Sequence, residues 1–413
     1  MSITNKNIFK ELKQLLNNYL TKNLVKDFIK ILDEDISIKP VDRAQIPDSE
    51  KFQIEYELPK GINYRIPVDK VITSCAKLLE ENKYYKLMLD LSQLMFFAGE
   101  ISYSLEIAED LISKLRTNSN YYNIKAETLL MISKIYWSQA YWDECRYYIA
   151  EAMNIFNSVK SETGIAKCEN MLGTLYGEKG EYDKAQKHLN NALKHLSDED
   201  DLLSRAMILT NLGIINTING EYEKAVWNHK NAEVKFNQLK DVRRSARVHH
   251  NVGMLYTRMK NYDAALEEFN KCITLSLEND YLSNCAVAYI GKAFIYTKMK
   301  NPALADAYTD KAMEIAYKLN DTLSIADIYK VKGMVQNDMN NFELSEELFE
   351  NSVRLNKDIE SGLNEAESSV QLGELLQKNN RNDEAKPYLE SATNFFNKVN
   401  TEKIKPGLVE QNI

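Results

Sequence analysis

The residues best suited to do chemistry in this chain form a cluster of cations and polar side chains near its middle. Arg243, Arg244, Arg247, His249 and His250 fall within eight consecutive residues. A guanidinium group can grip a carboxylate through two parallel hydrogen bonds, and amide side chains can pair with an otherwise unpaired peptide backbone. Such chemistry recognises a peptide without breaking a bond. The alternative is a solvated helix face with local ion pairs.

The spacing of the histidines does not predict a metal site. His249 and His250 are adjacent, so on a helix they point about 100° apart. His188 and His195 lie two helical turns apart, with no third ligand at helical spacing. HExxH, CxxC and EF-hand patterns are absent, as are a glycine-rich phosphate loop and a GxSxG motif. The sequence therefore predicts no metal, no other cofactor and no enzyme.

The elements that must position these side chains recur every 40 residues. A small residue stands at the reference position of most of the eight copies: Gln93, Ser133, Gly173, Gly213, Gly253, Ala293, Gly333 and Gly373. Further small residues follow 12 and 19 positions later, as in Ala185 and Ala192. A fixed period of this length is the signature of a solenoid, in which each repeat packs only on its neighbours.

Each repeat is predicted to be a helical hairpin. Leu172 and Leu175 follow helical spacing, Gly180 suits the left-handed residue that ends a helix, and Ala185 and Leu189 share a face of a second helix. Glycine inside a helix costs about 0.5–1 kcal/mol, so the reference glycines need a packing reason. Two helices that cross closely there would supply it.

The order of small and aromatic residues, clearest in LGTLYGEKGEYDKA, resembles the tetratricopeptide repeat over about residues 85–398. That repeat usually has about 34 residues. The 40-residue form is similar to the repeats of Pins-type polarity scaffolds and bacterial Rap-like peptide receptors. The proline that usually closes each repeat is missing, and Asp/Asn-rich junctions such as Asn320-Asp321 replace it. The resemblance implies an all-α fold, a right-handed α-solenoid (superhelix) of about eight hairpins over residues 83–398.

The resemblance also implies that a ligand lies in a concave groove lined by the first helix of each repeat. The lining positions fall six, three and two residues before the small reference residue, and one, four and five after it. Cations and amides at these positions are the predicted binding residues: Lys134, Lys167, Asn170, Asn211, Arg247, His250, Asn251, Arg258, Lys330 and Gln371. In tetratricopeptide domains an asparagine at the position of Asn211 and Asn251 often bonds the ligand backbone. A structural role, tying the neighbouring helix, is the alternative.

The first 82 residues do not follow the repeat. Residues 7–33 read as one or two amphipathic helices, and residues 68–82 as a helix that leads into the array. Between them, FQIEYEL-PKG-INYRIPV alternates apolar and polar residues around a Pro/Gly turn, which predicts a β-hairpin at 52–68. An extended loop packed on the first repeat is the alternative. Residues 399–413 read as a frayed tail.

The overall composition limits the class of partner. A net charge of −8 and a pI near 5.5 argue against nucleic acid and against an anionic membrane surface. No apolar run approaches the roughly 20 residues that span a bilayer, and the N-terminus lacks the apolar core of a signal peptide. The five cysteines are odd in number and scattered, which predicts buried reduced thiols. A cytoplasmic protein is expected.

These patterns favour a non-enzymatic scaffold that binds an extended peptide or a partner helix, held by acidic or C-terminal carboxylate groups. The alternative is a Rap-like, peptide-responsive regulator that acts through residues 1–82. No residue match carries a catalytic glutamine of that family onto Gln14, Gln45 or Gln53, and residues 1–82 lack a helix-turn-helix, which disfavours phosphatase activity and DNA binding. A homodimer stays open, because Phe395 and Phe396 end the array with no clear covering helix.

Overall fold

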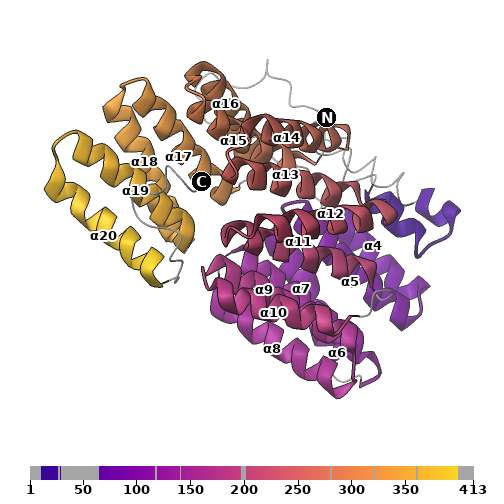
Figure 1. Ribbon diagram of the computed structural model, residues 1–413. Coiled ribbons are helices and arrows are strands. Elements are labelled where there is room, and N and C mark those ends of the chain that lie inside the picture. The colour runs from indigo at the N-terminus through magenta and orange to yellow at the C-terminus, as the bar shows by residue number, and fades with distance from the viewer. Residues whose placement is uncertain are drawn as a thin grey trace, which may run out of the picture. The chain divides into compact units, whose positions relative to one another are not determined.

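The structure is a computed structural model that describes residues 11–26, 28, 65–116, 119–139, 141–196, 201–279, 281–319, 321–359 and 361–398. The chain divides into two compact units, Met1–Ile135 and Tyr136–Ile413. All regular elements described in either unit are helices (Figure 1). None of these helices is both long and apolar enough to cross a lipid bilayer.

The first unit combines the N-terminal helices with the first repeat. Its described elements are helical segments at 11–17 and 22–26, then α4 (Arg65–Leu78), α5 (Glu81–Phe97), α6 (Ile101–Leu115), the short η2 (Ser119–Tyr121) and most of α7 (Tyr122–Ser138). They share one hydrophobic core, whose buried members include Leu12, Leu16, Val25, Val71, Leu87 and Leu111. The repeat formed by α5 and α6 therefore buries its apolar face against the N-terminal helices.

The predicted β-hairpin at 52–68 is only partly testable, because residues 52–64 lie outside the described part of the chain. Its last four residues were predicted wrongly, since Arg65 to Val68 form the first turn of α4. Val68, Val71 and Cys75 are all buried and follow helical spacing, so packing on the core favours a helix there. Pro67 fits the first turn of a helix, where its missing N–H has no intrahelical partner. The predicted helix at 68–82 exists but ends at Leu78.

The second unit contains hairpins in an unbroken series. Within each hairpin the two helices pack on each other, and each first helix also contacts the first helix of the next repeat. The described helices are α8 (Trp142–Ser158), α9 (Glu162–Glu178), α10 (Tyr182–Lys194), α11 (Leu202–Ile218), α12 (Tyr222–Gln238), α13 (Val242–Arg258), α14 (Tyr262–Glu278), α15 (Leu282–Lys298), α16 (Pro302–Leu319), α17 (Thr322–Asp338), α18 (Phe342–Asp358), α19 (Gly362–Lys378) and α20 (Asn382–Lys398).

The turns and junctions follow the chemistry predicted from the repeat. Gly180 has a φ of 74°, the left-handed conformation expected after a first helix, and Lys260 and Asn340 adopt similar angles at the same position of later repeats. At the junction before α17, the Asp321 carboxylate accepts a hydrogen bond from the backbone N–H of Ser324 at 3.1 Å. An N-cap of this kind starts the next helix without the usual proline.

The reference glycines lie where the helices of a hairpin cross, as predicted. A Cβ at Gly253 would stand 2.6 Å from the ring of Phe269, and one at Gly333 would stand 2.6 Å from Phe349. No side chain therefore fits at these positions unless the facing ring moves. All five cysteines are free and buried, which confirms the prediction of buried thiols.

The aromatic residues at the end of the last repeat are covered by the chain itself. Phe396 is buried with Ala366, Val370 and Ala392, and Phe395 packs against the same cluster. The last helix thus folds its rings back onto α19. The argument for a homodimer that rested on uncovered rings at this end no longer holds.

The position of His229 makes the second unit sensitive to acid. His229 is buried against Gly213, where other repeats have leucine or phenylalanine, and neither ring nitrogen has a hydrogen-bond partner. Burial lowers the pKa of His229 from 6.5 to about 4. Because the unfolded chain takes up the proton first as the pH falls, the stability that neutral His229 confers is present above pH 6.5 and lost between 6.5 and 4.

We expect the variant His229→Leu to remove much of this acid sensitivity. The loss of unfolding free energy of the wild type between pH 7 and 4 should shrink by on the order of 3 kcal/mol. Urea denaturation at a series of pH values measures it. A residual loss from His250, whose pKa is also lowered, should persist in the variant. Parallel curves for the two proteins would show that His229 does not carry the effect.

Candidate ligand-binding face

The predicted binding residues lie on the first helices of the repeats, and α13 carries the largest group. The face they form on α9, α11, α13, α15, α17 and α19 is called the first-helix face below. In the second unit it carries Lys167 and Asn170 on α9, Asn211 on α11, Arg247, His250, Asn251 and Arg258 on α13, Lys330 on α17 and Gln371 on α19. Lys134 belongs to the first unit, where its ammonium group lies 4.8 and 4.4 Å from the ring centres of Phe96 and Phe97.

Asn211 and Asn170 satisfy each other across two neighbouring first helices. The Asn211 amide Nδ2 donates to Asn170 Oδ1 at 2.9 Å and to Thr174 Oγ1 at 3.1 Å. Asn170 is buried and Asn211 half-buried. These bonds tie α11 to α9, so the Asn211 amide nitrogen already has partners within the protein.

Asn251 stands at the same position one repeat later, yet its amide nitrogen has no partner. Its Nδ2 is buried and makes no hydrogen bond in the described structure. Thr210 replaces Asn170 at the corresponding position of the preceding helix, and its hydroxyl donates to the Ala206 carbonyl. A buried donor without an acceptor costs about 1–3 kcal/mol, which a ligand carbonyl would recover.

His250, next to Asn251, is a second group with unused hydrogen-bonding capacity. Its Nδ1 is buried without a partner, and its ring lies 5.7 Å from that of Phe269. Burial and the nearby Arg247 lower the pKa of His250 to about 3. The imidazole is therefore neutral at physiological pH and offers a hydrogen bond without a charge.

Arg247 and Glu178 occupy a recessed part of the surface. Both side chains are exposed to water, yet both titrate as groups surrounded by protein. Burial lowers the pKa of Arg247, while the fields of Cys272, Asp321 and Glu178 act in the opposite direction. Burial likewise raises the pKa of Glu178, and Arg247 counteracts it. A side chain can be wetted and still have protein on several sides, and a recess at the level of α9, α13 and α17 explains both observations.

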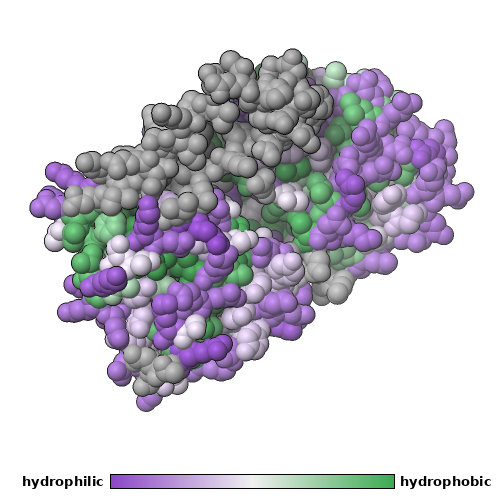
Figure 2. All heavy atoms as spheres, turned by 180° about the vertical axis from the view of Figure 1, so that it is seen from behind, coloured by the Kyte–Doolittle hydropathy of each residue, from purple (hydrophilic) through white to green (hydrophobic). Residues whose placement is uncertain are grey.

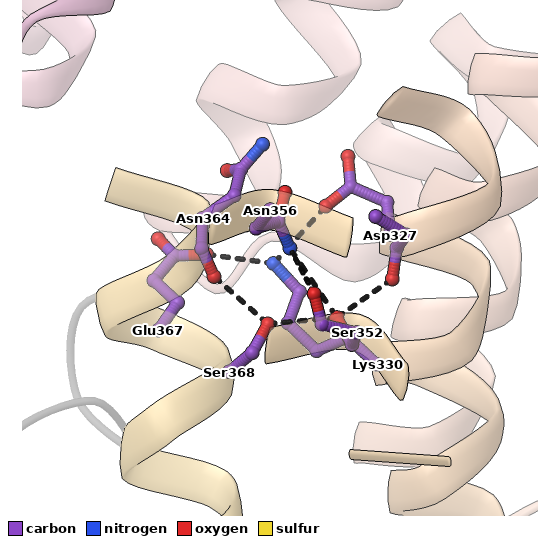
Figure 3. Close-up of polar contacts among 8 residues, drawn as sticks. Asp327, Lys330, Ser352, Asn356, Asn364, Glu367 and Ser368 are labelled. Carbon is purple, nitrogen blue, oxygen red and sulfur yellow. Dashed lines mark hydrogen bonds and ion pairs between the residues drawn. The ribbon is translucent and has the colours of Figure 1, made fainter. Parts of the chain in front are cut away.

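Lys330 is balanced by two carboxylates inside the protein (Figure 3). Its Nζ lies 2.7 Å from Glu367 Oε2 on α19 and 3.3 Å from Asp327 Oδ1 on α17. Burial opposes the charged forms, but the pair keeps the pKa of Glu367 below and that of Lys330 above its usual value. Burial raises the pKa of Asp327, whose Oδ1 makes no hydrogen bond. Lys330 therefore holds α17 to α19.

A network of hydroxyl and amide groups continues this connection through α18. The Ser352 hydroxyl donates to the Ala326 carbonyl at 2.8 Å and lies 2.9 Å from the Ser368 hydroxyl. Asn356 Nδ2 donates to the Ser352 carbonyl at 3.0 Å, and Ser368 donates to the Asn364 carbonyl at 2.8 Å. These buried contacts, which Figure 3 shows together, fix α17, α18 and α19 as one block.

The sequence analysis missed the acidic members of the first-helix face. Asp327 and Glu367 fall six positions before their reference glycines, as Arg247 does, and Glu178 falls five after, as Arg258 does. Reading only cations and amides at these positions therefore left them out. Arg258 acts on Glu367 and on Tyr182, whose buried hydroxyl has no hydrogen-bond partner. Lys167 likewise has Asp201 at 3.8 Å. The face is thus of mixed charge.

Models of the tetratricopeptide repeat match this chain at residues 170–194, 244–318 and 366–396, which lie on α9 and α10, α13 to α16, and α19 and α20. The chain is therefore an array that carries tetratricopeptide repeats, as its sequence pattern indicated. Among curated protein sequences, none matches it.

Several solved structures share the fold, and Rap-type proteins are among them. A Rap protein complexed with competence and sporulation factor matches at a TM-score of 0.61 and 15% identity, over 80% of this chain and 91% of that one. The Rap conjugation gene regulator of plasmid pLS20, in complex with the Phr* peptide, matches at 0.58 and 12%, over 78% and 98%. The apo quorum sensor NprR of B. thuringiensis matches at 0.53 and 14%, over 91% and 99%. Identities this low speak for a shared fold.

Proposed function

We propose that this protein is a non-enzymatic scaffold that binds an extended peptide or a segment of a partner protein on the first-helix face of its second unit. The observation that carries the proposal is the pair of unused hydrogen-bonding groups on α13, Asn251 Nδ2 and His250 Nδ1. Groups that are buried and unpaired in the free protein are satisfied when a peptide backbone supplies a carbonyl or an N–H. The two groups are adjacent in sequence and serve one segment of chain.

Arg247 gives this site a preference for a carboxylate. It lies one helical turn before Asn251, it is exposed to water, and its recessed setting strengthens any charge pair formed there. Glu178 already acts on Arg247, so a ligand carboxylate has to compete with that side chain. A free C-terminus or an acidic side chain next to an unpaired backbone is the ligand chemistry that fits.

A second candidate function is a peptide-responsive regulator that acts through the first unit. The fold-level likeness to Rap-type proteins solved with peptides supports it, as does the N-terminal segment that shares a core with the first repeat. Under this hypothesis a peptide on the first-helix face would also change the shape of the whole chain. The five buried free thiols support a reducing compartment, the cytoplasm, for either function.

The two asparagines provide a sharp test, because they are equivalent in sequence and differ in partners. The full chain would be screened against a library of short peptides with free or amidated C-termini, and the best binder used as probe. We expect Asn251→Ala and Arg247→Ala each to weaken binding by roughly tenfold or more, since each removes a contact worth over about 1.4 kcal/mol. Asn251→Ala should leave stability unchanged or slightly raised, because it deletes an unpaired donor.

Asn211→Ala is the matched control. It breaks two bonds between α9 and α11 and should cost about 1–3 kcal/mol of stability, with a smaller effect on binding. Binding that survives in Asn251→Ala and Arg247→Ala would refute the site. X-ray scattering with and without the probe separates the two functions, since compaction of the chain favours the regulator and an unchanged shape favours the scaffold.

A further inference from the structure

A row of exposed apolar side chains runs along the edge of the second unit where first and second helices are joined. Met259, Met299 and Met339 are the C-cap residues of α13, α15 and α17. Because α13 contacts α15 and α15 contacts α17, these equivalent helix ends lie side by side. Leu304 and Leu344, near the starts of α16 and α18, extend the row. All five residues, named here the methionine edge, are 40% to 50% exposed.

The fold itself does not require apolar residues at these positions. Lys179, Asn219 and Asn379 end α9, α11 and α19 at the position of the three methionines. Lys184 and Lys224 stand at the position of Leu304 and Leu344 in earlier repeats. The turns keep the same backbone in either case, so a polar residue serves equally well there. Figure 2 shows, for one face of the molecule, that hydrophobic patches interrupt a largely hydrophilic surface. The apolar row is confined to three consecutive repeats and has no structural reason.

The methionine edge is locally cationic in a protein of net negative charge. Lys260 and Lys300 directly follow Met259 and Met299 and are exposed, and Lys298 precedes Met299. Lys300 Nζ pairs with Asp338 at 2.9 Å, which neutralises the acidic residue beside Met339. No ion pair involves Lys260 within the described residues. Apolar side chains flanked by cations are complementary to a partner that presents apolar and acidic residues together.

The geometry points to one kind of occupant, and we propose that the methionine edge docks an acidic amphipathic helix of a partner protein. Neighbouring packed helices lie about 8–10 Å apart, so the three methionines are spaced by about that distance. A helix rises about 1.5 Å per residue, so apolar residues seven apart repeat every 10 Å or so on one side. Methionine side chains adapt to such ridges. This surface is distinct from the first-helix face, so the inference goes beyond the proposed function.

The test uses the full chain and a synthetic helical peptide of about 21 residues, with leucine at every seventh position and glutamates beside the leucines. A second peptide of the same composition has its leucines at every fifth position, which winds them around the helix. We expect the first peptide to bind, by fluorescence anisotropy, roughly tenfold or more tightly than the second. The triple variant Met259→Gln, Met299→Gln, Met339→Gln should lose that binding without a change in melting temperature, since the side chains are exposed.

Methionine oxidation gives an independent measurement on the unaltered protein. The bound peptide should slow oxidation of Met259, Met299 and Met339 by dilute hydrogen peroxide, detected by mass spectrometry of the digested protein. The variant Asn251→Ala should bind the peptide as tightly as the wild type, so failure of the ligand-binding proposal leaves this result unaffected. Equal binding of both peptides, or full binding by the triple variant, would overturn the inference. So would a wild-type dimer that the triple variant dissociates, because a second copy would then be the occupant.

Discussion

The variant Lys330→Met is expected to lower the free energy of unfolding by about 3–5 kcal/mol, because it leaves Glu367 and Asp327 buried without their cation. Only 12% and 13% of the Lys330 and Glu367 side chains are exposed, so water cannot replace the lost partner. The damage should be local to the block of α17, α18 and α19. Hydrogen exchange of these helices, together with urea denaturation, measures it.

The pH dependence of Lys330→Met should be opposite in sign to that of the wild type. In the wild type Lys330 holds the pKa of Glu367 below its usual 4.5, so that stability is present at neutral pH and lost as the pH falls through the lowered value. Without Lys330, burial alone raises the pKa of Glu367. The variant should therefore gain stability between pH 7 and 5, while the wild type does not gain from this group.

Two further variants keep this prediction testable. Lys332→Met removes an ion pair two residues away, between Lys332 and the exposed Asp310 at 2.6 Å, and should cost no more than about 1 kcal/mol. The double variant Lys330→Met, Glu367→Gln removes cation and carboxylate together and should recover a large part of the loss. If Lys330→Met and Lys332→Met behaved alike, the buried pair would have no special role.

The second large effect is expected at the crossing of α13 and α14. Gly253→Ala should cost about 2–3 kcal/mol, even though alanine favours a helix by about 1 kcal/mol over glycine. The new Cβ would stand 2.6 Å from the Phe269 ring. That ring cannot retreat, because Gly291 of α15 faces it just as closely from the next repeat. Thermal and urea denaturation measure the loss.

Gly177→Ala is the matched control for this substitution. Gly177 is also inside a first helix, but a Cβ there meets only Ile215, at an ordinary 3.5 Å. That variant should be stabilised by up to about 1 kcal/mol through helix propensity alone. A Gly253→Ala, Phe269→Leu double variant should be more stable than the sum of its single changes. Additive losses would mean that the ring and the new methyl group do not collide.

Much of the fold follows from the sequence because the repeat pattern is local. The left-handed turn at Gly180 and the close crossings at the reference glycines were predicted from residue type and spacing, and the structure agrees. The prediction failed at residues 65–68, where alternation suggested a strand. Val68 and Val71 there face a core built from segments far along the chain, and that packing decides the local structure.

The candidate site was less predictable than the fold. The register of the repeat placed the predicted side chains on first helices, and the same register contains Glu178, Asp327 and Glu367 for a reader who also considers acids. The sequence could not tell that Asn211 has partners while the equivalent Asn251 has none. That difference depends on whether Asn170 or Thr210 stands on the neighbouring helix and on how closely the helices pack.

The sequence by itself determined that this protein is an array of helical hairpins, with turns, caps and close crossings at known positions. Each of these features depends on residues within one repeat, so the chain order contains all the information. Only the tertiary structure decided which polar side chains are spent and which are offered. Asn211 meets a partner 41 residues away and Lys330 one 37 residues away. Such pairs exist only once neighbouring repeats have packed, since packing sets both their distance and the burial that gives each unpaired group its cost.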